Sequence, residues 1–211
     1  WNHAEQAVLS GTDEYSDHPE LVAARLEVAR QSAVEEIAER LEKAIYALDQ
    51  DQLSYNLQQA HQLQMSFELY PVVPVAQQYL ERIVECRNIV RNALQMMDQT
   101  ELLYAVEYAD SFNYNTEEVK FCRQMRDTVV QLEVDATYGC EVMVDSLLHD
   151  VVARADAIRY TSPAVEQIKT WLFETSEEKF VQLQLKAAVK ASDPARVVNV
   201  TIRLKDIFLG K

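Results

Sequence analysis

A repeated pattern of apolar residues, with a period of 46 to 49 residues, most strongly limits what this chain can fold into. When the sequence is shifted by 49 residues, segment 44–50 falls on segment 93–99, and later apolar positions keep matching at helical spacing. A shift of 46 residues places 109–114 on 155–160. A period of this length is typical of stacked supersecondary units, each of which buries its apolar face against its neighbours.

Each unit is predicted to contain one short and one long helix. Asp49 and Asp98 stand where a helix N-cap is needed, and Gln52 and Glu101 follow three residues later, which is a capping-box arrangement. Asp145 is the predicted cap of the third short helix. The predicted short helices are 50–64, 99–113, 146–159 and 194–208, and the predicted long helices are 20–47, 74–97, 117–143 and 163–191.

The sequence therefore predicts an all-α fold, with tandem helical hairpins stacked as an α-solenoid or an elongated helical bundle. Only 3 Gly and 5 Pro occur, which favours long uninterrupted helices. The polar stretch 174–179 is either a solvated face of the last long helix or a break in it, and we favour the solvated face. The chain begins at Trp1 and ends within the pattern at Lys211, so we expect a fragment of a larger protein. We predict a single helical-repeat domain over 1–211, with units of about 1–48, 49–97, 98–144, 145–192 and a partial 193–211.

The pattern resembles α-helical hairpin repeats of the solenoid type, with a unit close to the HEAT-like length. The spacing of Ala93-Leu94, Asp98, Leu102 and Ala105 is also similar to repeats in large cytoskeletal proteins of protists. The Trp/Gly/Tyr/Pro signature of tetratricopeptide repeats is absent from the sequence. This resemblance covers nearly the whole chain, implies a scaffolding or partner-binding role, and transfers no functional residue.

The charge and the cysteines of the chain indicate which kind of binding partner and which cellular compartment to expect. Asp and Glu number 34 against 20 Lys and Arg, a net charge of -14, which disfavours nucleic acid and anionic membranes and favours a protein with a basic surface. No apolar run reaches the roughly 18–20 residues that span a membrane. Cys86, Cys122 and Cys140 form no C-x-x-C pair and fall in helical stretches, which predicts reduced thiols and a cytoplasmic location.

No residue set amounts to a catalytic, cofactor or metal signature, so we expect a protein that is not an enzyme. No two His share a helix at i, i+4, and no Gly-rich phosphate loop occurs. Cys122 is grouped by helical spacing with apolar residues, which favours core packing over nucleophilic chemistry. The alternative, an all-α metal-dependent hydrolase or small-ligand domain, would use His61, His149 and Asp150.

The candidate partner-binding residues fall in two places. Segment 66–74 is an apolar connection between a short and a long helix, whereas the corresponding connection at 113–116 is shorter and polar. Irregular insertions in repeat arrays often lie on a binding face. Two repeat-equivalent tyrosines could also form a surface stripe. The predicted binding residues are Phe67, Tyr70, Val72 and Val73 of the connection, together with Tyr55 and Tyr104.

From these observations we expect a non-catalytic scaffold or adaptor segment that is cytoplasmic and associated with the cytoskeleton. Its partner would be another protein with basic groups. An alternative is self-association, in which exposed terminal helices stack end to end as a homo-oligomer.

Overall fold

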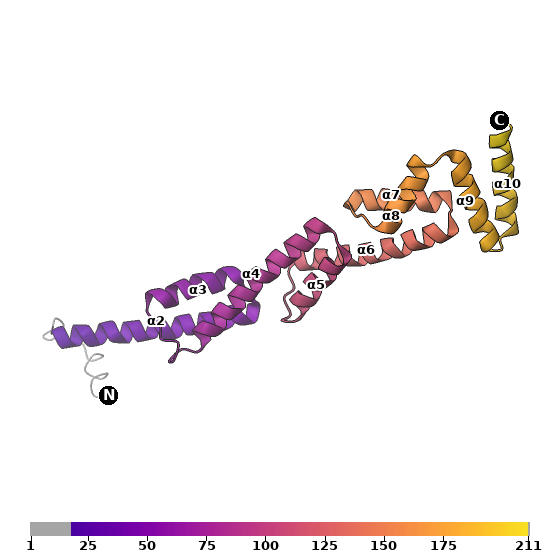
Figure 1. The fold of residues 1–211 in the computed structure, drawn as a ribbon. Helices are drawn as coiled ribbons and strands as arrows, with labels where there is room; N and C mark the ends of the chain where they lie inside the picture. The colour runs from indigo at the N-terminus through magenta and orange to yellow at the C-terminus, as the bar shows by residue number, and fades with distance from the viewer. Residues whose placement is uncertain (1–17, 211) are drawn as a thin grey trace. The chain divides into compact units, whose positions relative to one another are not determined.

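The computed structural model describes residues 18–210, and all regular structure in this range is helical (Figure 1). This confirms the predicted all-α fold of alternating short and long helices. Among the described residues no helix is both long and apolar enough to cross a membrane. The long helices are α2 (Pro19–Ala47), α4 (Val72–Met96) and α6 (Glu117–Val142), and the short ones are α3 (Gln50–Gln62), α5 (Gln99–Asp110), α7 (Asp145–Ile158) and α10 (Pro194–Phe208). The fourth long segment is made of α8 (Pro163–Lys169), η2 (Thr170–Glu174) and α9 (Glu177–Lys190).

The backbone conformation of the links between helices repeats along the chain. A residue with positive φ ends each long helix segment, and another follows each of the first three short helices. None is Gly, so each costs roughly 1–2 kcal/mol in the left-handed region. The same costly conformation returns after 49 or 46 residues, which confirms the repeat. The residues are Leu48, Met97, Met143 and Ser192 after the long segments, and Gln64, Asn113 and Arg159 after the short ones.

Small residues in the last helical turn accept the hydrogen bonds that close these links. The backbone N–H groups of Met65, Tyr114 and Tyr160 donate to carbonyls five residues earlier, at 3.0, 3.0 and 2.9 Å. This is the six-residue bond of a Schellman motif, which satisfies carbonyls that lack a helical partner. The apolar side chains that follow the link then pack inward and are buried. The accepting carbonyls belong to Ala60, Ala109 and Ala155, all of them buried.

Two of the predicted N-caps are confirmed and one is wrong. The carboxylates of Asp49 and Asp98 each accept two backbone N–H groups at 2.8–3.1 Å. The cap of α7 is instead Val144, which offers no side-chain bond, and Asp145 is the first helical residue. The carboxylate of Asp145 accepts from Gln184 at 2.7 Å and from Arg203 at 2.8 Å, so it ties α7 to α9 and α10.

The last long helix was predicted to continue through 174–179, and this is wrong. Thr175 and Ser176 lie outside helices, after the π-helical turn of η2. The Thr175 hydroxyl and its backbone N–H both donate to the Thr170 carbonyl at 3.0 Å. Local Ser and Thr hydrogen bonds of this kind compete with helical ones, which explains the break.

The chain divides into two compact units, residues 1–87 and 88–211, with the boundary inside α4. In the first unit α3 packs on the C-terminal half of α2, where Val34, Ile37 and Leu41 are buried. In the second unit α5, α7 and α8 pack on α6, and α10 packs on α9. Whether the helices form one domain of successive units stays a prediction.

Candidate protein-binding groove in the N-terminal unit

The predicted binding segment is divided between a loop and a helix. Residues 63–71 connect α3 to α4, and α4 begins at Val72. The prediction that Val72 and Val73 lie in the loop is therefore wrong, because both belong to the first turn of α4. Phe67 remains in the loop with 60% of its surface exposed, Tyr70 is half-buried, and Val73 is buried.

Two hydrogen bonds attach this loop to α2. The Arg30 guanidinium donates to the Leu63 carbonyl at 3.4 Å, and the Gln31 amide donates to the Tyr70 hydroxyl at 3.3 Å. These contacts hold the two ends of the loop, while Phe67 and Leu69 between them are 60% and 74% exposed. The loop thus presents an apolar tip from an anchored base.

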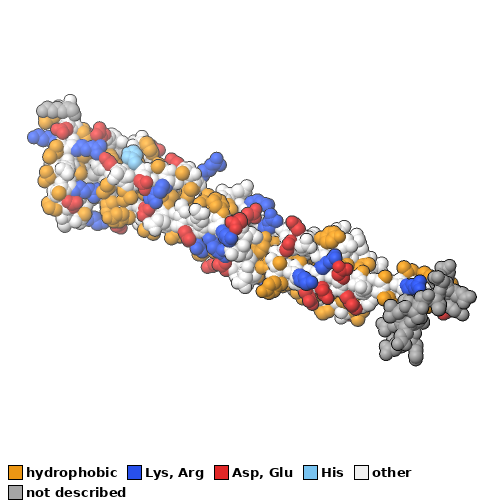
Figure 2. Space-filling model, turned by 180° about the vertical axis from the view of Figure 1, so that it is seen from behind, with side chains coloured by type: hydrophobic (Ala, Val, Ile, Leu, Met, Phe, Trp, Pro, Cys, Tyr) orange, Lys and Arg blue, Asp and Glu red, His pale blue; other side chains and the backbone are white. Residues whose placement is uncertain are grey.

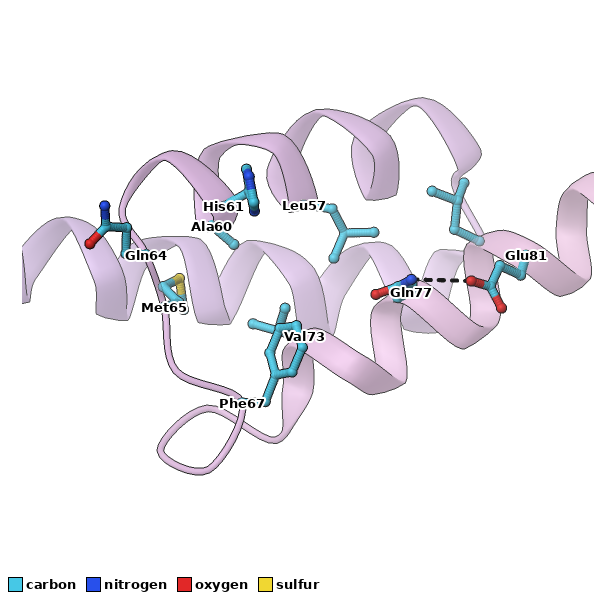
Figure 3. A pocket seen from close by; sticks show the side chains of 10 residues that line it. Leu57, Ala60, His61, Gln64, Met65, Phe67, Val73, Gln77 and Glu81 are labelled. Carbon is cyan, nitrogen blue, oxygen red and sulfur yellow. Dashed lines mark hydrogen bonds between the residues drawn. The ribbon is translucent and has the colours of Figure 1, made fainter.

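A groove lies between α3 and the start of α4, with the loop across its end (Figure 3). Its volume is about 550 Å³, and its apolar lining comes from α3, the loop and α4. In Figure 3 the Phe67 ring lies beside Val73 and faces the space between the two helices. The lining residues are Leu57, Ala60, Met65, Phe67, Val73 and Leu80, with His61, Gln64, Gln77 and Glu81 at polar positions.

The charge around the groove is negative. Residues 18–87 contain 11 Asp and Glu against six Lys and Arg. Among the lining residues Glu81 carries the acidic group, and its carboxylate accepts from the Gln77 amide at 3.2 Å. Single hydrophobic side chains are scattered among charged ones on the face shown in Figure 2, as on most protein surfaces. A concave apolar site is the more informative feature.

The structure brings together only some of the predicted partner-binding residues. Phe67 and Val73 line the groove, whereas Tyr55, Tyr70 and Val72 do not. Tyr55 is 54% exposed on α3 in the first unit, and Tyr104 is 51% exposed on α5 in the second. Sequence reasoning missed Leu57, Met65 and Leu80, which line the same groove.

The candidate chemical groups fall in different units of the chain. His61 lines the groove in the first unit, and His149 and Asp150 belong to α7 in the second. The Asp150 carboxylate forms an ion pair with Arg154 at 2.9 Å. Within 18–210 no group of three or more His, Cys, Asp and Glu side chains is arranged to bind a metal. Cys122 is fully buried, and burial raises the pKa of its thiol despite two nearby arginines.

Comparison with known proteins finds a myosin. The chain is 33% identical over 196 residues to the high molecular weight form of myosin-1 from Acanthamoeba castellanii. The match covers 93% of this chain, but the chain spans only 12% of the length of that protein. No protein-family model matches the chain, and no solved structure matches it. The chain is thus similar along nearly its whole length to a small part of a cytoskeletal protein.

Proposed function

We propose that this chain is a non-catalytic protein-interaction segment of a cytoskeleton-associated protein, and that a partner docks in the groove between α3 and α4. The observation that carries the proposal is the anchored loop that presents Phe67 over an apolar groove of about 550 Å³. The similarity to a form of myosin-1 supports the cytoskeletal setting. Cys86, Cys122 and Cys140 form no disulfide bond, which is in keeping with a reducing cytoplasmic compartment.

The charge of the unit points to a partner with basic residues. Within residues 18–87, 11 acidic residues outnumber six basic ones, so a partner with Lys or Arg beside its apolar anchor gains favourable long-range attraction. Electrostatic attraction of this kind weakens as salt screens the charges. An amphipathic helix would suit the groove, because its apolar face can enter while its basic groups stay at the acidic rim.

The test is a selection of displayed 16-residue peptides against the full chain, followed by calorimetry with the enriched peptides. We expect enriched peptides to carry Lys or Arg next to apolar residues, and to bind more weakly as salt increases. Phe67→Asp should reduce their affinity at least tenfold. Leu69→Asp is the matched control, because Leu69 is 74% exposed on the same loop but does not line the groove. Equal binding to the wild type and to Phe67→Asp would overturn the proposal.

Self-association is a second candidate function, and α10 is the observation that favours it. Val198 and Ile202 are 57% and 54% exposed on this helix, one turn apart. Earlier short helices carry polar or small residues at one or both of these repeat positions, such as Ser54 and Gln58 in α3. None of the residues of α10 is buried, although it packs on α9. An exposed apolar helix face of this kind is typical of an association surface.

Light scattering over a range of concentrations tests this second function. We expect a mass that increases with concentration in the wild type and a constant monomer mass in Ile202→Glu. Asn199→Glu is the control, because Asn199 is exposed on the same helix and the charge change is identical. A constant monomer mass of the wild type at every concentration would exclude self-association through α10.

A further inference from the structure

In the next copy of the repeat, aromatic rings occupy positions that hold non-aromatic residues at the end of α3 beside the groove. A shift of 49 residues places Leu63 and Met65 on Phe112 and Tyr114. The rings of Phe112 and Tyr114 stack with centroids 5.6 Å apart and an interplanar angle of 9°, and they are only 8% and 5% exposed. Tyr108 adds an edge contact to Phe112 at 5.9 Å. The junction after α5 is thus packed with aromatic side chains.

The equivalent positions in the first unit hold smaller or more flexible side chains. Gln59 takes the place of Tyr108, and Met65 takes the place of Tyr114. Met65 is buried and lines the groove. The third copy also carries an aromatic residue here, since Tyr160 is equivalent to Tyr114 and is 5% exposed. In two of the three copies, therefore, an aromatic ring occupies the position that borders the open groove in the first copy.

We propose that the groove receives one aromatic side chain, supplied by a basic partner. A dry cavity of about 150 Å³ is enough to bind benzene, so a groove of about 550 Å³ has room for a ring. Phe67 at the end of the groove provides an aromatic surface for edge or offset contacts, and Met65 provides a sulfur that packs well against rings. We therefore expect the bound group to be an aromatic side chain, like the ring that the other copies hold at this position.

The basic character of the partner follows from the rim. Glu81 lines the groove, and Glu68 is exposed on the loop beside Phe67. A Lys or Arg within one helical turn of the aromatic anchor could lie near these carboxylates. The inference rests on the proposed function, because it names the group with which the docking partner enters the groove.

The first experiment uses p-cresol, which reproduces the side chain of tyrosine, as a probe for the full chain. Methyl resonances of Leu57, Met65 and Val73 should shift in a saturable way, with a dissociation constant roughly in the millimolar range expected of so small a ligand. Met65→Tyr should restore the ring found in the other copies, close the groove and weaken p-cresol binding at least tenfold. Met96→Tyr is the matched control, because Met96 is 72% exposed and does not line the groove. It should leave binding unchanged.

A second variant keeps the inference testable if Met65→Tyr disturbs the fold. Phe67→Ala alters an exposed loop residue, and it should weaken p-cresol binding about threefold to tenfold. Absence of saturable shifts in the wild type, or equal p-cresol binding by the wild type and both groove variants, would overturn the inference.

The selected peptides separate the two proposals. Peptides that bind the groove through aliphatic residues alone would overturn the aromatic guest while leaving the docking function in place. Binding of p-cresol without any groove-binding peptide would instead count against the docking function. Binding peptides whose single Phe or Tyr cannot be replaced by Ala without at least a tenfold loss would support both.

Discussion

Asn56 is the residue whose replacement should reveal most about the first unit. It lies on α3 with 1% of its surface exposed, and neither its amide nitrogen nor its amide oxygen has a hydrogen-bond partner. The repeat places Ala105 and Val151 at the same position, and both are fully buried. A buried polar group without a partner costs roughly 1–3 kcal/mol. We therefore expect the free energy of unfolding to increase when the amide is removed.

Asn56→Val is the suitable change. Val and Asn have similar helix propensities, and Val is closer in volume to Asn than Ala is, so the cavity term stays small. Allowing for some strain, we expect a gain of about 1–2 kcal/mol. Amides of α2 and α3 that exchange only when the unit unfolds should then exchange roughly 5–30-fold more slowly. Hydrogen exchange is the preferred measurement, because it reports on the first unit separately from the second.

The control and the refuting result are both specific. Asn92→Val makes the same change on an exposed position of α4 and should alter stability by no more than about 0.5 kcal/mol. If Asn56→Val accelerated exchange in α2 and α3, the amide would be satisfied in the folded protein, and the reasoning from its lack of partners would fail. A buried water bound to Asn56 would produce that result.

Three further changes test the second unit. Burial and a 3.0 Å hydrogen bond to Glu133 raise the pKa of Tyr160 to about 12. The protonated phenol should therefore stabilise the fold below pH ~10, and this contribution should be lost as pH rises through about 12. In Tyr160→Phe the loss of stability over this pH range, measured by denaturant unfolding beside an ultraviolet titration, should be smaller. Gly139→Ala should change the denaturation midpoint little, because a gain of about 1 kcal/mol in helix propensity offsets the close approach of the new Cβ to the Leu148 side chain, at 3.2 Å. The larger side chain of Gly139→Val should destabilise the fold by about 1–3 kcal/mol. Gln184→Leu should destabilise by about 1–3 kcal/mol in urea unfolding, because it leaves the buried Met143 carbonyl without its side-chain donor and removes one of the two donors to the Asp145 carboxylate.

Helix positions were predictable because their determinants are local in sequence. The capping carboxylates of Asp49 and Asp98 lie within three residues of the N–H groups that they accept. The apolar period then gives each helix length, and the repeat supplies an independent check on it. The short helices begin within one residue of their predicted starts.

The errors have causes that act over longer distances or compete locally. Asp145 does not cap α7 because its carboxylate binds Gln184 and Arg203, which lie 39 and 58 residues away in sequence. The break at Thr175 depends on a hydroxyl that finds the Thr170 carbonyl, a local alternative that periodicity does not register. Phe67 and Val73 were predicted as binding residues, but their shared groove was not, because its lining comes from three separate segments: Leu57 on α3, Met65 in the connection and Leu80 on α4.

The departures of the first unit from the repeat lead to one consistent interpretation. Asn56 replaces an apolar core residue, Met65 replaces a buried tyrosine, and the 63–71 connection exposes Phe67. The Asn56 amide lacks a hydrogen-bond partner, Met65 borders the groove, and stability is commonly given up where a site is needed. If Asn56→Val and Met65→Tyr both stabilise the first unit, only Met65→Tyr should abolish ring binding. Loss of binding in both would show instead that the groove opens through general loosening of α3, and that Met65 has no special part in it.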